Sequence, residues 1–164
     1  CQTSPVPRQS RGISHSWLIN SISAREFLVG NPGWQGSNTF VDLGLMLSVG
    51  GFREGMSSCN DRDLAIRLLR ATSRQPALPA EWTASWHIRS GQQSISTTRN
   101  AKLSGLSHFW RLYGNEMNEE TSSLFFERSH TLFGIEMTDI VGSAEQTHAL
   151  PSSRGDLQTM RSAT

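Results

Sequence analysis

The chain is poor in lysine and in cysteine. It has a single lysine, Lys102, against fourteen arginines, and its two cysteines are Cys1 and Cys59. Two cysteines cannot build a disulfide framework or a cysteine-based zinc site, so we expect a reducing, cytoplasmic setting. Arginine suits bidentate contacts to carboxylate or phosphate groups, although the base composition of the gene is the simpler explanation for its excess.

Strong net charge and long apolar runs are also missing. The formal charge is +1 over 164 residues, which gives no electrostatic reason to expect a nucleic-acid or membrane-surface partner. No apolar run has the length of a transmembrane helix, so no membrane-spanning segment is expected. Because the sequence starts at Cys1 rather than at a methionine, we expect a processed product or a piece of a longer protein.

Several motifs of common enzyme classes are absent. The sequence contains no Gly-Lys-Ser/Thr phosphate loop, no Gly-x-Ser-x-Gly nucleophile turn, no His-Glu-x-x-His pair and no Gly-x-Gly-x-x-Gly loop. Cys59 could pair with one of the five histidines as a nucleophile, but no local pattern supports that role. An inert loop cysteine is the simpler interpretation.

The residues that are present divide the chain into four segments. Residues 1–16 are rich in proline and serine and predict a disordered arm, and the serine-rich residues 142–164 predict a disordered tail. Residues 17–97 mix glycine-rich loops with short apolar stretches, including the strand-like "TASWHIRS" at 83–90. Residues 98–141 predict a helical extension.

Three helices are predicted by apolar periodicity and by their terminal residues. The first runs from about residue 61 to 71, with Ser58 or Asn60 as its cap. The second covers about residues 98–117. The third starts at Asn118, has two glutamates in its first turn and is closed by Gly134.

The stretch "GGFREGMSSCNDRDLAIRLL" at residues 50–69 holds the strongest candidates for chemistry. Asp61 and Asp63 are two positions apart, so on a helix their side chains point about 200° apart and only one can face a pocket. Asp61 lies in the first turn, where free backbone N–H groups favour the ionised carboxylate. It could be a general base, or both aspartates could simply stabilise the start of the helix.

The remaining charged candidates also have two interpretations. His87 could be a metal ligand or a hydrogen-bonded structural histidine. Arg53, Glu54 and Arg62 could contact a ligand, but solvated surface charge is the simpler interpretation.

The order of the motifs resembles the C-terminal half of nucleotide-sugar glycosyltransferases with the GT-A fold, and in particular the large inverting family called family two. The segments "QGSNTF", "LSVGGFREG", "NDRDLAIRLL" and "WHIR" carry this resemblance over residues 30–90. The family's Gly-Gly-Phe-Asp-Glu motif and its Glu-Asp-x-Asp-Leu-x-x-Arg-Leu motif are matched at Gly50, Gly51, Phe52, Glu54, Asp61, Asp63, Leu64, Arg67 and Leu68. The resemblance implies a Rossmann-like α/β fold, here an incomplete GT-A half over residues 17–97.

The resemblance also implies roles for individual residues. Asp61 occupies the position of the general base that deprotonates the acceptor hydroxyl. Gly51, Phe52 and Glu54 occupy the acceptor side of the cleft. Two further residues are candidates for the donor side. His87 would help to hold a divalent cation, Mn²⁺ or Mg²⁺, that offsets charge on the departing diphosphate. Arg89 could contact the same diphosphate of the nucleotide-sugar donor.

Three departures from the family pattern bear on function. Arg53 replaces an aspartate and could alter acceptor preference, and Asn60 replaces a glutamate beside Asp61. No Asp-x-Asp motif precedes Gly50, so the N-terminal, donor-binding half is missing and would have to come from a longer chain.

The expected function is transfer of a sugar from a nucleotide-sugar donor to a hydroxyl acceptor such as a glycan. We expect this activity to be absent without the missing half. The alternatives are a non-catalytic glycan- or protein-binding remnant of the same fold, and an unrelated small α/β interaction protein.

Overall fold

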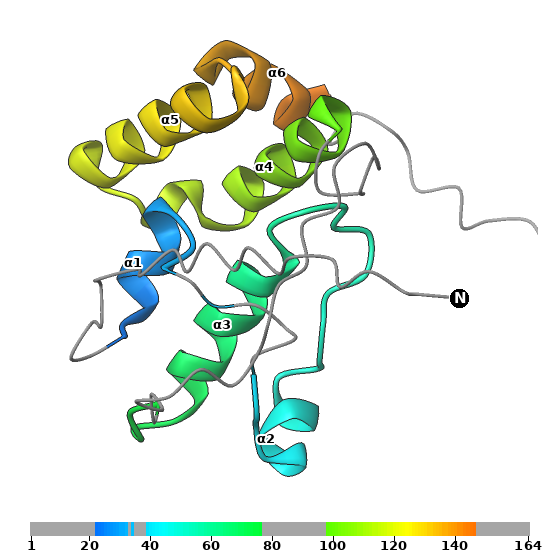
Figure 1. Cartoon of the computed structure of the whole chain (residues 1–164), viewed down its shortest axis with the longest axis vertical. Coiled ribbons are helices and arrows are strands. Elements are labelled where there is room, and N and C mark those ends of the chain that lie inside the picture. The colour runs from blue at the N-terminus through cyan, green and yellow to red at the C-terminus, as the bar shows by residue number, and fades with distance from the viewer. Residues whose placement is uncertain (1–21, 33, 35–38, 77–97, 147–164) are drawn as a thin grey trace, which may run out of the picture.

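The fold is described by a computed structural model that covers residues 22–32, 34, 39–76 and 98–146. Helices make up the regular structure of these ranges (Figure 1). In chain order they are α1 (Ala24–Val29), α2 (Leu43–Ser48), α3 (Asn60–Ala71), α4 (Arg99–Tyr113), the short 3-10 helix η3 (Gly114–Glu116), α5 (Glu119–Phe133) and α6 (Met137–Gln146). In the view of Figure 1, α2 lies at the opposite end of the molecule from α5 and α6.

The expected α/β fold, an incomplete GT-A half, is wrong for the described residues, because none of them forms a strand. The apolar stretch before Gly50 forms the helix α2. Asp42 caps this helix, and its Oδ1 accepts a hydrogen bond from the N–H of Leu45 at 2.9 Å. A short apolar run alone does not distinguish a strand from a helix, and here the cap selects the helix. The strand-like residues 83–90 lie outside the described ranges.

The three predicted helices are confirmed, with changes at their ends. The second becomes α4 followed by η3. The third begins after Asn118, whose Oδ1 accepts from the N–H of Thr121 at 2.9 Å, and it ends at Gly134 in the left-handed conformation with φ of 60°. The boundary placed at residue 142 falls inside α6, which continues to Gln146.

The first turn of α3 differs from the prediction. Neither Ser58 nor Asn60 caps the helix through its side chain. Cys59 precedes the helix in the left-handed conformation, with φ of 64°, which is uncommon for a residue other than glycine. The Asn60 Oδ1 accepts from the N–H of Asp61 at 3.0 Å.

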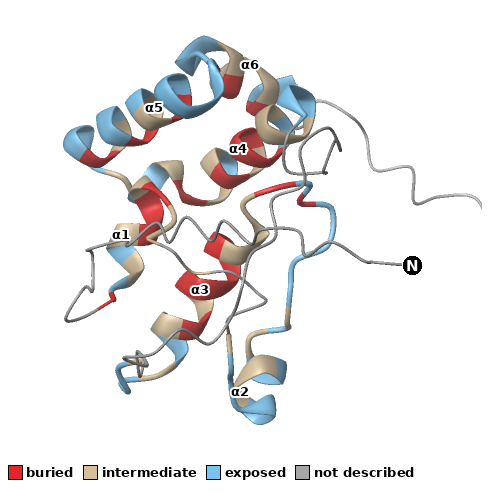
Figure 2. Cartoon of the chain, viewed as in Figure 1, coloured by how far each residue is buried: buried red, intermediate tan, exposed pale blue. Residues whose placement is uncertain are grey.

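The core lies where α3 meets α1 and where α4 packs on α5 and α6 (Figure 2). Its largest fully buried side chains are Phe27, Leu64, Ile66, Leu106, Phe109, Phe125, Ile135 and Ile140. In contrast, α2 buries no residue. The helices beyond residue 98 therefore share a core with α1 and α3 and are more than an appended extension.

Arg62 is the residue that ties α1 to this core. It is 7 % exposed, so the expectation of a solvated surface charge is wrong. Its guanidinium donates to the carbonyl oxygens of Phe27, at 3.0 and 2.8 Å, and of Leu28, at 2.9 Å. Its Cζ lies 4.0 Å from the centre of the Phe109 ring. One buried cation thus satisfies carbonyls near the end of α1 and stacks on α4.

The backbone of α4 approaches the loop before α3 very closely at one point. A Cβ atom placed on Gly105 would lie 2.1 Å from the Oγ and 2.6 Å from the carbonyl oxygen of Ser58. Only glycine fits there, because the contact includes main-chain atoms. This contact fixes the loop that leads into α3 against α4.

None of the helices in the described ranges is long and apolar enough to cross a membrane.

Candidate functional site at the start of α3

The two aspartates at the start of α3 have different surroundings. Asp63 is fully buried, whereas Asp61 is half-buried in the first turn of the helix. The expectation that one of the two carboxylates faces a pocket stays a prediction, because neither lines the two cavities described below. Because Asp63 is fully buried, Asp61 is the only one of this pair that a ligand outside the core could reach.

Asp63 is the centre of a cluster of hydrogen bonds, which we call the Asp63 cluster. Its Oδ2 accepts from Arg67, at 3.0 Å from Nε and 2.6 Å from Nη2. Its Oδ1 accepts from the Tyr113 hydroxyl at 2.8 Å and from the Arg53 Nε at 3.1 Å. A buried carboxylate is tolerated only when it is paired and hydrogen-bonded in this way.

These contacts govern ionisation within the Asp63 cluster. Burial alone would raise the pKa of Asp63, but hydrogen bonds from Arg67, Tyr113 and Arg53 hold it below its ordinary value. Burial, followed by the hydrogen bond to Asp63, raises the pKa of Tyr113 to about 12. At neutral pH Asp63 is therefore a fixed anion and Tyr113 a neutral donor, and neither is free to exchange a proton with a substrate.

Arg67 extends the cluster to the double-glycine turn. It donates to the carbonyl oxygens of Val49 and, at 2.7 Å from Nη2, of Gly51. Gly50 and Gly51 have φ of 76° and 64°, a region that favours glycine. The two sequence motifs are thus joined physically, because the anion on α3 orients Arg67 and Arg67 holds the turn.

The acceptor-side candidates lie on or after this turn. Gly51 is half-buried through the turn, whereas Phe52 and Glu54 are exposed. Arg53, the residue expected to influence acceptor choice, directs its guanidinium to Asp63 while its side chain remains 40 % exposed. Its first role in this structure is therefore to hold the loop to α3.

The donor-side and metal candidates, Arg89 and His87, lie outside the described residues. Within the ranges that are described, no three histidine, cysteine, aspartate or glutamate side chains gather closely enough to hold a metal ion. A divalent cation at His87 therefore stays a prediction.

Cys59 lies half-buried beside the mouth of α3. Its Sγ is 3.8 Å from the Arg62 Nη1 and 3.8 Å from the Ser58 Oγ. The expectation of an inert loop cysteine is not tested, but the sulfur lies beside the buried Arg62 guanidinium.

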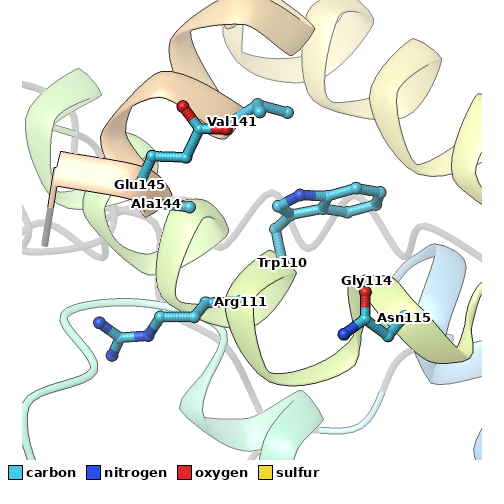
Figure 3. A pocket seen from close by; sticks show the side chains of 7 residues that line it. All are labelled: Trp110, Arg111, Gly114, Asn115, Val141, Ala144 and Glu145. Carbon is cyan, nitrogen blue, oxygen red and sulfur yellow. The ribbon is translucent and has the colours of Figure 1, made fainter. Parts of the chain in front are cut away.

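An open cavity of about 350 Å³ lies away from these motifs, between α4 and α6 (Figure 3). Trp110 and Asn115 line it from the α4 side, and Val141 and Glu145 line it from α6. None of these residues was a functional candidate from the sequence, because they are brought together only by the packing of α6 on α4.

Sequence reasoning also missed the Asp63 cluster as a unit. The spacing of Asp63 and Arg67 was a usable signal, because residues four apart on a helix are neighbours and can pair. The contribution of Tyr113 had no such signal, because it lies fifty positions further along the chain.

Comparisons of the chain with protein-family models, with curated proteins and with solved structures returned no match.

Proposed function

We propose that this chain carries the acceptor side and the general base of a nucleotide-sugar glycosyltransferase. Asp61 removes the proton from an acceptor hydroxyl as that oxygen attacks the anomeric carbon of the donor sugar. Gly51, Phe52 and Glu54 line the acceptor side. The reaction forms one C–O bond and breaks the bond between the sugar and the diphosphate, while the proton passes to the Asp61 carboxylate.

The observation that carries the proposal is the link between the two motifs through the Asp63 cluster. Arg67 binds the Gly51 carbonyl and the buried Asp63 at the same time. The acceptor-side turn is thereby fixed against the helix that bears Asp61. A base and a substrate-positioning turn must be held in a constant relation for such catalysis, and these contacts provide it.

We assign donor binding to residues outside α3 and the double-glycine turn. Arg89 and a divalent cation near His87 would face the diphosphate, and a cytoplasmic setting is retained from the low cysteine content. A bound cation would offset the charge of the diphosphate leaving group.

Exposed apolar side chains around α2 support the need for a second, donor-binding half. We call these residues the α2 surface: Phe40, Leu43, Leu47 and Phe52, of which Phe40 is 94 % and Leu43 and Leu47 are each 69 % exposed. Exposed apolar side chains this close together in the sequence are candidates for contact with a partner. The double-glycine turn follows α2 directly in the chain, so a donor-binding half that contacts the α2 surface would lie next to the proposed acceptor site.

Transfer is tested by incubating radiolabelled nucleotide sugars with the 164-residue chain and with the longest polypeptide encoded around it. We expect transfer only from the longer polypeptide. Asp61→Asn should lower its rate about 100-fold or more, because a general base contributes on that scale. Glu127→Gln, at an exposed position on α5, removes the same charge and should leave the rate unchanged.

Two results would contradict the proposal. Full transfer by Asp61→Asn with an unchanged circular dichroism spectrum would remove the base assignment. Transfer by the 164-residue chain alone would remove the need for a second half.

The alternative is a non-catalytic glycan- or protein-binding function, and the α2 surface favours its protein-binding form. It predicts that residues 40–52 are protected from hydrogen exchange in the longer polypeptide while no nucleotide sugar is consumed. Glycosyl transfer predicts both protection and consumption, so one pair of measurements distinguishes the two functions.

A further inference from the structure

A second, smaller cavity between α4, the loop at Gly55 and α6 has an unusual lining. Its volume is about 120 Å³. Four polar residues of α4 face it, and α6 adds Ser143; the four are Ser104, Ser107, His108 and Arg111. The last three follow Ser104 by three, four and seven residues, and this spacing places all four on one face of the helix. A helix face turned towards another helix is normally apolar, so this polar stripe requires an explanation.

Ser107 shows that the lining is incomplete as it stands. Its side chain is only 3 % exposed, and its Oγ is buried without a hydrogen-bond partner. A buried hydroxyl without a partner is destabilising, because the group has lost its water and gained nothing. A partner that enters the cavity would remove this penalty.

A single arginine, Arg111, supplies the positive charge of the cavity lining within the described residues. Burial first, and then the positive charges of Arg111 and Arg53, lower the pKa of His108, while the Gly55 backbone and Asp63 act in the opposite direction. None of the cavity's lining residues within the described ranges is acidic.

We propose that this cavity binds a phosphate-type oxyanion, with Arg111 supplying the charge and the hydroxyls of Ser107 and Ser104 supplying hydrogen bonds. An arginine guanidinium and hydroxyl donors without a competing carboxylate are the groups that recognise such anions. The cavity volume of about 120 Å³ is several times the volume of about 30 Å³ that one water molecule occupies in the liquid. The cavity therefore has room for one phosphoryl group. The proposal does not rest on glycosyl transfer.

The neighbouring cavity indicates where the rest of a larger ligand would lie. Arg111 and Ala144 line both cavities, and Figure 3 shows Arg111 extending away from Trp110. A phosphoryl group held at Ser107 would therefore place an attached group in the open cavity beside Trp110. A sugar ring could stack there on the indole.

Binding is tested on the full chain by calorimetry and by amide chemical shifts, with inorganic phosphate, glucose 1-phosphate and uridine diphosphate as probes. We expect saturable binding with shifts centred on residues 104–111 and 143. Arg111→Met should weaken binding about tenfold or more, because it removes a charge-assisted contact. Ser107→Ala should weaken it by about threefold to tenfold.

The matched control is Arg25→Met, which removes the same charge from an exposed position on α1 and should leave the affinity unchanged. Tighter binding of glucose 1-phosphate than of phosphate identifies a sugar phosphate as the ligand, and tighter binding of uridine diphosphate identifies a nucleotide. Equal affinity for all three identifies the free anion.

Equal weakening by Arg25→Met and Arg111→Met would overturn the proposal, because binding would then follow net charge alone. Unchanged binding by a folded Ser107→Ala variant would likewise remove the cavity as the site.

Discussion

At the scale of single residues, the Asp63 cluster accounts for why the start of α3 carries two aspartates with different roles. Asp63 is buried and accepts hydrogen bonds from Arg53, Arg67 and Tyr113, whereas Asp61 is only half-buried. The free energy of burying a charged carboxylate stays low only while all of its hydrogen-bond donors remain.

Asp63→Asn should lower the free energy of unfolding by about 3 kcal/mol, because it leaves the cations of the Asp63 cluster without their buried counter-charge. Urea denaturation followed by circular dichroism measures this loss. Asp139→Asn is the matched control, because it breaks an exposed ion pair with Arg99 and should cost less than about 1 kcal/mol. Equal losses in the two variants would contradict the central place given to Asp63.

Tyr113 provides a pH-dependent test, because it is the only tyrosine in the chain. Its folded-state pKa is raised from 10.0 to about 12, so the native protein holds this proton more tightly than the unfolded chain does. The resulting stability is fully present below pH 10 and is lost as the pH rises towards 12. The loss should approach about 3 kcal/mol, since the shift is about two pH units.

The ultraviolet absorbance of tyrosinate follows this single residue directly, and urea denaturation at each pH measures the stability. Tyr113→Phe should remove the alkaline loss that belongs to this group. A native-state titration midpoint near pH 10 would contradict the hydrogen bond to Asp63.

At the scale of elements, two glycines inside helices give opposite predictions. Gly105→Ala should destabilise the protein by about 2 kcal/mol or more, because the new methyl group would overlap main-chain atoms of Ser58. Gly142→Ala, in α6, meets no atom within 4 Å and should stabilise the protein by about 0.5–1 kcal/mol. Thermal unfolding of both variants measures the difference. Stabilisation by both would show that α4 does not approach Ser58 as closely as described.

The helices were predictable where their signals are local. Asn118 and Gly134 mark both ends of α5 in the sequence, and the structure places the helix between them. The helix α2 was not predictable from periodicity, because six residues of mixed apolar character fit a strand as well as a helix. The choice depended on a hydrogen bond from Leu45 to Asp42.

The candidate site was predictable to the same extent. The different surroundings of Asp61 and Asp63 follow from helix geometry alone, and the structure agrees. The burial of Arg62 does not follow from helix geometry. Its partners are carbonyls 34 and 35 positions away, and only the packed fold brings them near. The polar cavity at Ser107 depends on α6 in the same way, and α6 overlaps residues that the composition assigned to a tail.

At the scale of the whole molecule, stability should be uneven along the chain. The helix α2 buries none of its residues, whereas α3 buries most of its first turns. Local opening free energy follows buried contacts, so we expect the amides of α2 to exchange within seconds and those of α3 only near global unfolding. Hydrogen exchange with mass spectrometry compares the two segments in one experiment. Equal protection of both would mean that α2 is held by contacts that its exposure does not reveal.

The hydrogen bond between Asp63 and Tyr113 also has a consequence for the order of folding. It joins residues fifty positions apart, so the chain must close a long loop before the bond can form, and closure of such loops comes at an entropic cost. We expect a contact of this sequence separation to form late in folding. We therefore expect Tyr113→Phe to accelerate unfolding in stopped-flow experiments while refolding keeps its rate. The Asp63 cluster would then set the unfolding rate of the native protein and leave its folding rate unchanged.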